Sequence, residues 1–245
     1  MPQPRFGYRR SFVSDYFPPG LKWLLIINTA VFLVDFLVPP LHRLLWTLFA
    51  LTADGVIHGV GIPFVWQLFT YMFLHGGILH LLFNMLTLWF FGSQIERDWG
   101  TRRFLKYYFL CGIAAGVCVV IANLLTVDFP TIGASGAIFG VLVAFAVLYP
   151  NQTVLMNFLF PVKAMYMVMI YAAIELILTI RPGRSGISTI AHLGGMAFGY
   201  IYLKGRVPRV KLPSAGAAYK QWKLYRAKKK FQVYMRKHGN GPWVN

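Results

Sequence analysis

Two short segments of this sequence place a nucleophile and a base among apolar residues. The segment Gly133–Gly136 puts Ser135 at the start of one apolar run, and Ala191–Gly195 puts His192 inside another. An imidazole can take the proton of a hydroxyl group and leave an oxygen that attacks a carbonyl carbon. Polar side chains inside apolar spans are costly and usually face a protein interior or a water-filled cavity. We therefore interpret this pair as the catalytic centre of a membrane-embedded serine hydrolase.

The composition indicates a membrane protein independently of that pair. Hydrophobic residues make up 57% of the chain and charged residues 13%, whereas an ordinary soluble domain carries about 25% charged residues. The net charge of +17 comes largely from the two ends. We divide the chain into a cytoplasmic N-terminal arm (1–20), a membrane domain (21–204) and a basic cytoplasmic tail (205–245).

Apolar runs near the roughly 20 residues that a spanning helix needs predict an all-α, six-helix membrane bundle. The six predicted spans cover residues 21–38, 75–95, 104–125, 135–149, 163–180 and 188–204. Glycine, proline and aspartate interrupt the apolar segment 40–66 between the first two spans. We expect this segment to lie along the outer interface or dip into it, packed on protein, because open backbone cannot face lipid.

Basic residues set the expected orientation, because loops rich in Lys and Arg stay on the cytoplasmic side. Arg97, Arg102, Arg103 and Lys106 follow the second span, and the tail has eleven basic residues and no acidic one. Both termini are therefore expected in the cytoplasm. The starts of the second, fourth and sixth spans then lie on the outer side, and so does the opening of the catalytic site.

The second span adds two polar residues at the depth of Ser135 and His192. His80 and Asn84 are four residues apart, so they lie on one face of a helix. Both can donate hydrogen bonds to the oxyanion that forms when a hydroxyl attacks a carbonyl. The alternative is an interhelical hydrogen bond that only joins two spans. The shared depth favours the oxyanion-binding interpretation.

Small residues explain how the nucleophile and the base can meet. Gly136 and Gly140 form a small-xxx-small ridge on the fourth span, and Gly195 and Gly199 form one on the sixth. Such ridges let two helix backbones approach closely. We therefore expect the fourth and sixth spans to touch beside the catalytic pair.

These residues together resemble the rhomboid family of intramembrane serine proteases over roughly residues 21–204. The matching motifs are GxSG at Gly133–Gly136, AHxxGxxxG at Ala191–Gly199, HxxxN at His80–Asn84 and ExxxG at Glu96–Gly100, with His75 in the place of a further family histidine. The order and topology of the motifs make the resemblance specific.

The resemblance implies a Ser-His dyad that cuts transmembrane substrates near their outer end without a required acid. Ser135 would be the nucleophile and His192 the base, and the Ser135 backbone N–H with His80 and Asn84 would bind the oxyanion. Phe139 falls where an aromatic ring stacks on the base histidine. Supporting glycines, by the same resemblance, are Gly133, Gly136, Gly195 and Gly199. One departure is Gln67, which stands where the interfacial loop commonly has Arg.

Two acids, Asp35 and Glu175, lie within predicted spans. Glu175 is about five residues from the outer end of the fifth span, a depth at which it could approach the site. We interpret it as a neutral carboxyl group that faces the bundle, and we expect Glu175→Gln to leave most activity. Asp35 is interpreted as interfacial. The dyad needs neither acid.

Other catalytic chemistries lack their residues. A metalloprotease would need HExxH, and an aspartyl protease would need two apposed carboxyl groups; the sequence has neither pattern. We expect no cofactor and no metal ion.

The expected partners are transmembrane protein substrates and the lipid bilayer. Aromatic residues alternate with Lys and Arg in the tail, which suits either an interfacial helix on anionic lipid or a solvated tail that sets topology. Nucleic acid is not expected as a partner. The alternative to a protease is a rhomboid-like scaffold that binds or escorts transmembrane helices without cutting them. The compact plan suggests a bacterial inner (plasma) membrane.

Overall fold

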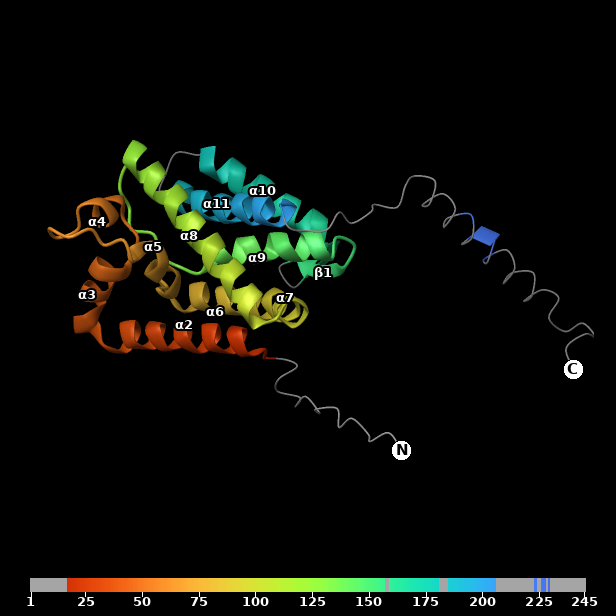
Figure 1. The fold of residues 1–245 in the computed structure, drawn as a ribbon, viewed down its shortest axis with the longest axis horizontal. Helices are drawn as coiled ribbons and strands as arrows, with labels where there is room; N and C mark the ends of the chain where they lie inside the picture. The colour runs from red at the N-terminus through yellow and green to blue at the C-terminus, as the bar shows by residue number, and fades with distance from the viewer. Residues whose placement is uncertain are drawn as a thin grey trace, which may run out of the picture. The chain divides into compact units, whose positions relative to one another are not determined.

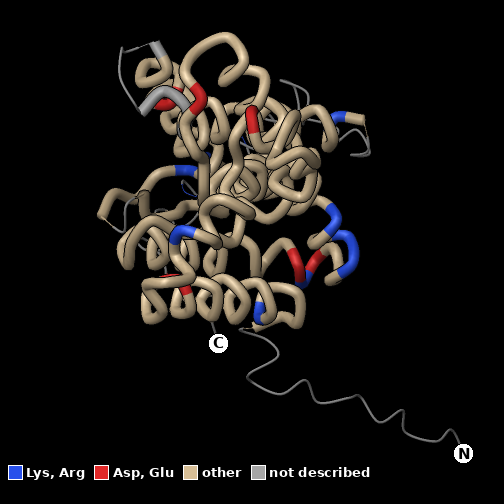
Figure 2. The backbone as a smooth tube through the Cα atoms, turned by 90° about the vertical axis from the view of Figure 1, so that its left-hand side faces the viewer, with Lys and Arg blue, Asp and Glu red and all other residues tan. Residues whose placement is uncertain are grey.

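The computed structural model of the protein describes residues 17–156, 159–180 and 185–205, and the single positions 223, 226, 227 and 229. The chain divides into two units, residues 1–205 and 206–245, and all of the elements labelled in Figure 1 lie in the first. The predictions for the N-terminal arm before residue 17 and for lipid binding by the tail fall outside the described residues. Most of the tube in Figure 2 is tan because charged residues are few.

Helices dominate the first unit (Figure 1), in agreement with the helical fold class expected from the sequence. The elements are α2 (Pro19–Leu37), α3 (Pro39–Phe49), α4 (Ala53–Ile57), α5 (Gln67–Thr70), η1 (Tyr71–Phe73), α6 (Ile78–Thr87), η2 (Leu88–Gly92), α7 (Ser93–Trp99), α8 (Thr101–Leu125), α9 (Ser135–Leu148), β1 (Thr153–Met156), β2 (Phe160–Lys163), α10 (Ala164–Ile180) and α11 (Ser185–Lys204). Six of the helical stretches coincide closely with the six predicted spans.

Three of these stretches are long and apolar enough to cross a membrane among the described residues: α2, the continuous run Ile78–Trp99, and α8. Helices α9 and α10 are apolar but shorter. Helix α11 has 20 residues. The number of spans therefore stays a prediction, although the helices are where the apolar runs predicted them.

Helix α11 packs against α8, α9 and α10, and these four helices lie side by side in Figure 1. Two buried tyrosines tie this group together. Tyr71 Oη donates to the Gly112 carbonyl on α8 at 2.7 Å, and Tyr107 Oη donates to the Gly140 carbonyl on α9 at 2.8 Å. Buried hydroxyl groups need such partners, so each tyrosine fixes the helix that carries its acceptor.

Glu96 fastens the start of α2 to the end of α7. Its carboxylate is 2% exposed and accepts hydrogen bonds from the backbone N–H groups of Gly20, at 2.7 Å, and Leu21, at 2.6 Å. Thr101 Oγ1 donates to the same carboxylate at 2.6 Å. The first N–H groups of a helix have no partner within it and favour a negative charge. Glu96 supplies both the acceptors and the charge.

The segment 40–66, which we expected at the outer interface and packed on protein, contains helices α3 and α4. Gln67, which by the family resemblance replaces a common Arg, anchors the following turn. Its Oε1 accepts from the Thr52 backbone N–H at 3.3 Å, and its Nε2 donates to the Thr47 carbonyl at 3.1 Å. Trp66 Nε1 donates to the Leu48 carbonyl at 2.7 Å. The uncharged side-chain amide of Gln67 therefore hydrogen-bonds to the backbone of this loop.

Three features differ from the expected pattern. Strands β1 and β2 form an antiparallel hairpin between α9 and α10, which the all-α prediction lacked. The second apolar helix begins at Ile78 rather than at residue 75, because Gly76 and Gly77 precede it in non-helical backbone. Within that helix η2 is a π-helical turn, a feature that often occurs at functional sites.

Candidate active site

Ser135 and His192 meet through their side chains, although 57 positions separate them in the sequence. Ser135 is the first residue of α9 and His192 lies in α11. The distance between Ser135 Oγ and His192 Nε2 is 2.8 Å, within hydrogen-bond range. The His192 side chain is 17% exposed, so the pair is largely shielded from solvent. This geometry suits proton transfer from the hydroxyl to the ring.

Glycines bring the backbones of α9 and α11 into contact next to that pair. A Cβ atom at Gly195 would collide with the Gly136 carbonyl group. One turn further on, a Cβ at Gly199 would lie 3.2 Å from Gly140 Cα and 2.5 Å from Tyr107 Oη. We call this line of contact, formed by Gly136, Gly140, Gly195 and Gly199, the glycine seam. Side chains of any size there would push the two catalytic helices apart.

His80 and Asn84 face the start of α9 across a small cavity of about 220 Å³. Gly133 lies between these two side chains and Ser135, and its backbone φ is +114°. A Cβ atom at this position would lie 2.8 Å from His80 Nε2, so the close approach requires glycine. Asn84 is 8% exposed, and its Nδ2 has no hydrogen-bond partner among the described residues. A buried donor without a partner therefore lies beside the cavity that Ser135 also lines. The cavity is lined by Tyr71, His80, Asn84, Thr131, Ile132, Gly133, Ser135, Phe139, Ala191 and His192.

Phe139 lies one turn after Ser135 and covers one face of the base. Its ring centroid is 4.2 Å from that of His192, and the two ring planes differ by 15°. The stacking holds the plane of the imidazole against the α9 surface. The resemblance implied an aromatic ring at this position.

His75 contacts His80, contrary to what regular helical spacing indicates for residues five apart. Their ring centroids are 5.0 Å apart with planes at 65°. This is because His75 precedes α6 and does not follow its helical path. Both of its ring nitrogens are buried, and neither has a hydrogen-bond partner in the described part of the chain.

Glu175 lies next to His192, although from the sequence we did not include it in the catalytic group. Its Oε1 is 2.9 Å from His192 Nδ1, on the side of the ring away from Ser135. The distance is that of an ion pair, but Nδ1 lacks a well-directed hydrogen bond. The carboxylate therefore lies close to Nδ1 but off the N–H direction. The two side chains are 17% and 12% exposed for His192 and Glu175.

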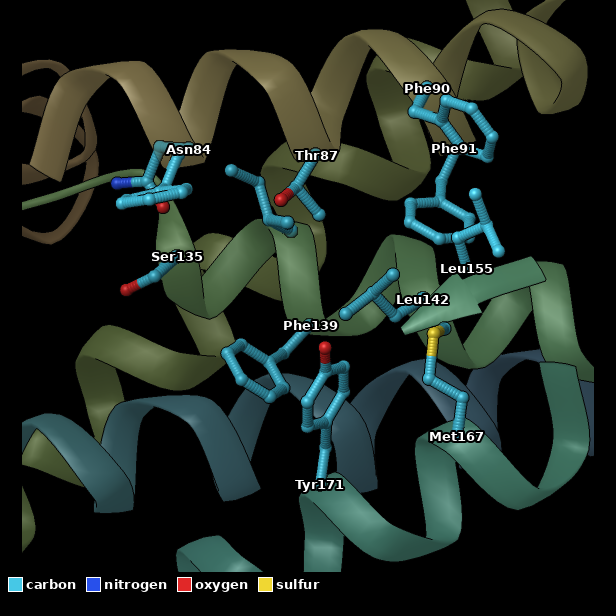
Figure 3. Close-up of a pocket in the computed structure, with 12 residues that line it drawn as sticks. Asn84, Thr87, Phe90, Phe91, Ser135, Phe139, Leu142, Leu155, Met167 and Tyr171 are labelled. Atoms are coloured by element: carbon cyan, nitrogen blue, oxygen red, sulfur yellow. The ribbon is translucent and has the colours of Figure 1, made fainter. Parts of the chain in front are cut away.

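An apolar groove of about 490 Å³ opens beside Ser135 (Figure 3). It runs between α6–η2 on one side and α10 on the other, with α9 as its floor. Figure 3 shows Thr87, Phe139 and Tyr171 directed into it. The lining residues are Phe83, Asn84, Thr87, Phe90, Phe91, Ser135, Ile138, Phe139, Leu142, Leu155, Met167 and Tyr171. The sequence analysis did not predict this groove, because its lining comes from five separate elements, α6, η2, α9, β1 and α10.

A family model confirms what the motifs suggested. The model described as the Rhomboid domain matches residues 63–209, which contain all of the residues of the candidate site. The chain belongs to the rhomboid family. Membership makes it an integral membrane protein, in agreement with its apolar helices.

Several rhomboid relatives are between 31% and 38% identical to this chain over the aligned residues. The rhomboid protease GluP of Bacillus subtilis is 38% identical over 156 residues, which are 62% of this chain and 27% of GluP. YdcA of the same organism is 31% identical over 66% of this chain and 82% of its own length. Mitochondrial rhomboid protein 1 of Saccharomyces cerevisiae is 34% identical over 76% of this chain and 53% of the yeast protein. The chain thus spans about a quarter of GluP and about half of the yeast rhomboid.

Proposed function

We propose that this rhomboid protein is an intramembrane serine protease. It hydrolyses peptide bonds in or near the transmembrane segments of membrane-protein substrates, through the Ser-His dyad of Ser135 and His192. The observation that carries the proposal is the 2.8 Å distance between Ser135 Oγ and His192 Nε2 at the edge of an apolar groove. Relatives named as rhomboid proteases support the same activity.

The reaction follows from the two side chains. His192 Nε2 takes the Ser135 hydroxyl proton while Oγ forms a bond to the substrate carbonyl carbon. The resulting tetrahedral intermediate breaks its C–N bond, and the amine leaves with the proton from Nε2. An acyl-serine ester remains. Water then loses a proton to Nε2 and attacks the ester carbonyl. The bond between the acyl carbon and Ser135 Oγ breaks, Nε2 returns its proton to Oγ, and the carboxylic acid leaves.

We assign the oxyanion hole to the backbone N–H of Ser135 and to the side chains of His80 and Asn84. Ser135 is the first residue of α9, and the N–H groups of a first helical turn have no partner within the helix. The unpaired Asn84 Nδ2 faces the same cavity. Donors aimed at a developing negative charge in a dry site stabilise it strongly.

The groove supplies the route for a transmembrane substrate. Its lining is apolar apart from Asn84, Thr87, Ser135 and the Tyr171 hydroxyl, so an apolar helix can enter it without losing hydrogen bonds that it had in lipid. Rhomboid proteases act on transmembrane substrates within the bilayer. A substrate segment in the groove would bring its carbonyl groups to Ser135.

We also propose the six-span topology, with both termini in the cytoplasm and the site opening to the outer side. The shorter helices α9 and α10 and the 20-residue α11 supply the three spans beyond the long apolar ones. A bacterial plasma membrane is the location that we propose. Single cysteines at residues 98 and 128 should test the orientation, because only the second should react with a membrane-impermeant maleimide from outside.

Fluorophosphonate labelling tests the catalytic proposal. A fluorophosphonate forms a stable bond to an activated serine, so the wild-type protein in detergent or lipid should become labelled. Ser135→Ala should abolish the label at unchanged thermal stability, and His192→Ala should abolish it because the hydroxyl is no longer activated. A folded wild-type protein that resists labelling in several lipids, yet binds transmembrane helices, would instead identify a scaffold that escorts helices without cutting them.

A further inference from the structure

We propose that Glu175 is a positioning residue that holds His192 with its proton on Nδ1, so that Nε2 is free to accept the Ser135 proton. The inference rests on the proposed function of the Ser135–His192 pair and adds a third residue to it. It reverses two expectations from the sequence, that Glu175 is a neutral carboxyl group and that Glu175→Gln leaves most activity. The reason is the position of the carboxylate relative to the two nitrogens of the ring.

The imidazole lies between a hydroxyl and a carboxylate. Nε2 is 2.8 Å from Ser135 Oγ, and Nδ1 is 2.9 Å from Glu175 Oε1. Since Glu175 Oε2 is buried and has no partner among the described residues, no other hydrogen bond at that oxygen draws the carboxylate away from the ring. Among the described residues, His192 Nδ1 is therefore a donor within reach of this carboxylate and has no other acceptor.

The position of Glu175 on α10 is an interior one. Ile174, Leu176 and Ile177 next to it are 45%, 56% and 56% exposed, and they form the outward face of the helix. Glu175 itself is 12% exposed on the opposite face. A carboxylate at membrane depth is expected to face a protein interior or cavity and to have a partner. His192 is the partner that the structure provides.

Threonines fix α10 against α11 one turn away from this contact. Thr179 Oγ1 is 2.6 Å from Thr189 Oγ1 on α11 and donates to the Glu175 carbonyl at 2.8 Å. Glu175 and Thr179 are one turn apart on α10, and Thr189 and His192 are nearly one turn apart on α11. The Glu175–His192 contact is therefore part of a fixed helix–helix contact.

Phe139 and Glu175 constrain different properties of the same ring. The stacked Phe139 ring fixes the plane of the imidazole. Stacking does not distinguish the two tautomers, and it does not distinguish the imidazole from one that is flipped by about 180° with Nδ1 and Nε2 on opposite sides. A carboxylate can only accept hydrogen bonds. It therefore selects the tautomer with the proton on Nδ1, and it stabilises the positive ring that forms when Nε2 takes the serine proton. The Nδ1 proton stays on His192 throughout the reaction and is not transferred to Glu175.

Glu175→Gln is the direct test, because it keeps the shape of the side chain and removes its charge and its acceptor-only character. In serine proteases the equivalent acid-to-amide change costs about 10⁴-fold in turnover through the wrong tautomer. Because Phe139 still holds the ring plane here, we expect a smaller loss, on the order of 10²-fold in kcat, with KM little changed. The rate of fluorophosphonate labelling should fall in parallel, and Glu175→Asp should recover part of it.

Thr179→Val is the matched control, since it removes the neighbouring α10–α11 hydrogen bond without touching His192. Valine keeps the branched shape of threonine and therefore the packing of α10 on α11, so turnover should fall at most a few-fold, far less than in Glu175→Gln. Nitrogen-15 NMR of labelled histidine provides a readout that needs no substrate, with the His192 signal assigned by its loss in His192→Gln. The proton should lie on Nδ1 in the wild type and in Thr179→Val, and should shift toward Nε2 in Glu175→Gln.

The outcomes separate this proposal from the proposed function. Wild-type turnover and an unchanged tautomer in Glu175→Gln would overturn the role of Glu175 and leave the Ser-His dyad intact. Equal losses in Glu175→Gln and Thr179→Val with no tautomer change would reduce Glu175 to a packing residue and also overturn it. Should the wild type neither label nor cut, the protease proposal fails, while the NMR measurement still decides whether Glu175 sets the tautomer.

Discussion

The two sides of α9 are built in opposite ways. Toward α11 the glycine seam brings backbone against backbone, so that a Cβ at Gly195 has no room beside the Gly136 carbonyl. Toward α6 and α10 lies the groove of about 490 Å³, lined by large apolar side chains (Figure 3). The seam holds α9 close to α11 and so keeps Ser135 near His192. The groove leaves space for a bound molecule.

The comparison shows how one helix can be both rigid and accessible. Ser135, at the start of α9, belongs to both sides. It contacts His192 next to the seam, and it also lines the groove. Substitutions on the seam should therefore affect every reaction of the serine. Substitutions in the groove should affect only reactions with large substrates.

Gly195→Ala should have the largest effect, because it breaks the seam. The added Cβ collides with a backbone carbonyl that cannot rotate away, and overpacking of this kind costs about 1–3 kcal/mol, occasionally more. We expect a lower thermal midpoint together with loss of labelling and of cleavage. The control is Gly205→Ala, whose Cβ would meet its nearest atom at 3.8 Å. Normal stability and activity in Gly195→Ala would show that the seam does not set the catalytic distance.

His80→Ala and Asn84→Ala should have the next largest effect, at the boundary between seam and groove. Removing one oxyanion donor typically lowers turnover by about 10² to 10³-fold. The remaining donors or water can make the loss smaller. Cleavage rates in proteoliposomes and thermal midpoints should be measured together. If both variants cleave at the wild-type rate, the second span contributes packing only, and the oxyanion assignment is wrong.

Thr87→Trp should have the smallest effect on the catalytic chemistry, because it fills the groove and leaves the seam unchanged. We expect normal fluorophosphonate labelling and about tenfold slower cleavage of a transmembrane substrate, as expected for loss of substrate binding rather than of transition-state contacts. Leu82→Trp on the same helix is the control, since Leu82 is 52% exposed and does not line the groove. Equal effects of the two substitutions on cleavage would argue against the groove as the substrate route.

The positions of the helices were predictable from the sequence because each rests on local signals. Apolar runs mark the helices, and small residues at four-residue spacing mark the face that α9 and α11 share. The proximity of Ser135 and His192 follows from these two signals together. The hairpin between β1 and β2 was missed because four-residue strands are too short to show a pattern.

The contact between Glu175 and His192 could not be derived, because it depends on how far α10 is rotated about its axis. A signal was present nonetheless. Met167, Tyr171, Glu175 and Thr179 recur every four residues on α10 and so share one face. Met167 is 1% exposed and Tyr171 lines the groove, which places that face toward the interior. The contact of His75 with His80 likewise depends on a feature beyond helical spacing, because the helix starts after His75.

The proposal that Ser135 is the nucleophile of an intramembrane protease is tested most directly by cleavage of a single-span substrate in proteoliposomes. The substrate should carry small residues near the outer end of its helix, and mass spectrometry should identify both products. We expect the wild-type protein to cut one bond in or next to the span, and Ser135→Ala to produce no fragments at the same thermal midpoint. Equal cleavage by the wild type and by Ser135→Ala would contradict the assignment of Ser135 as the nucleophile.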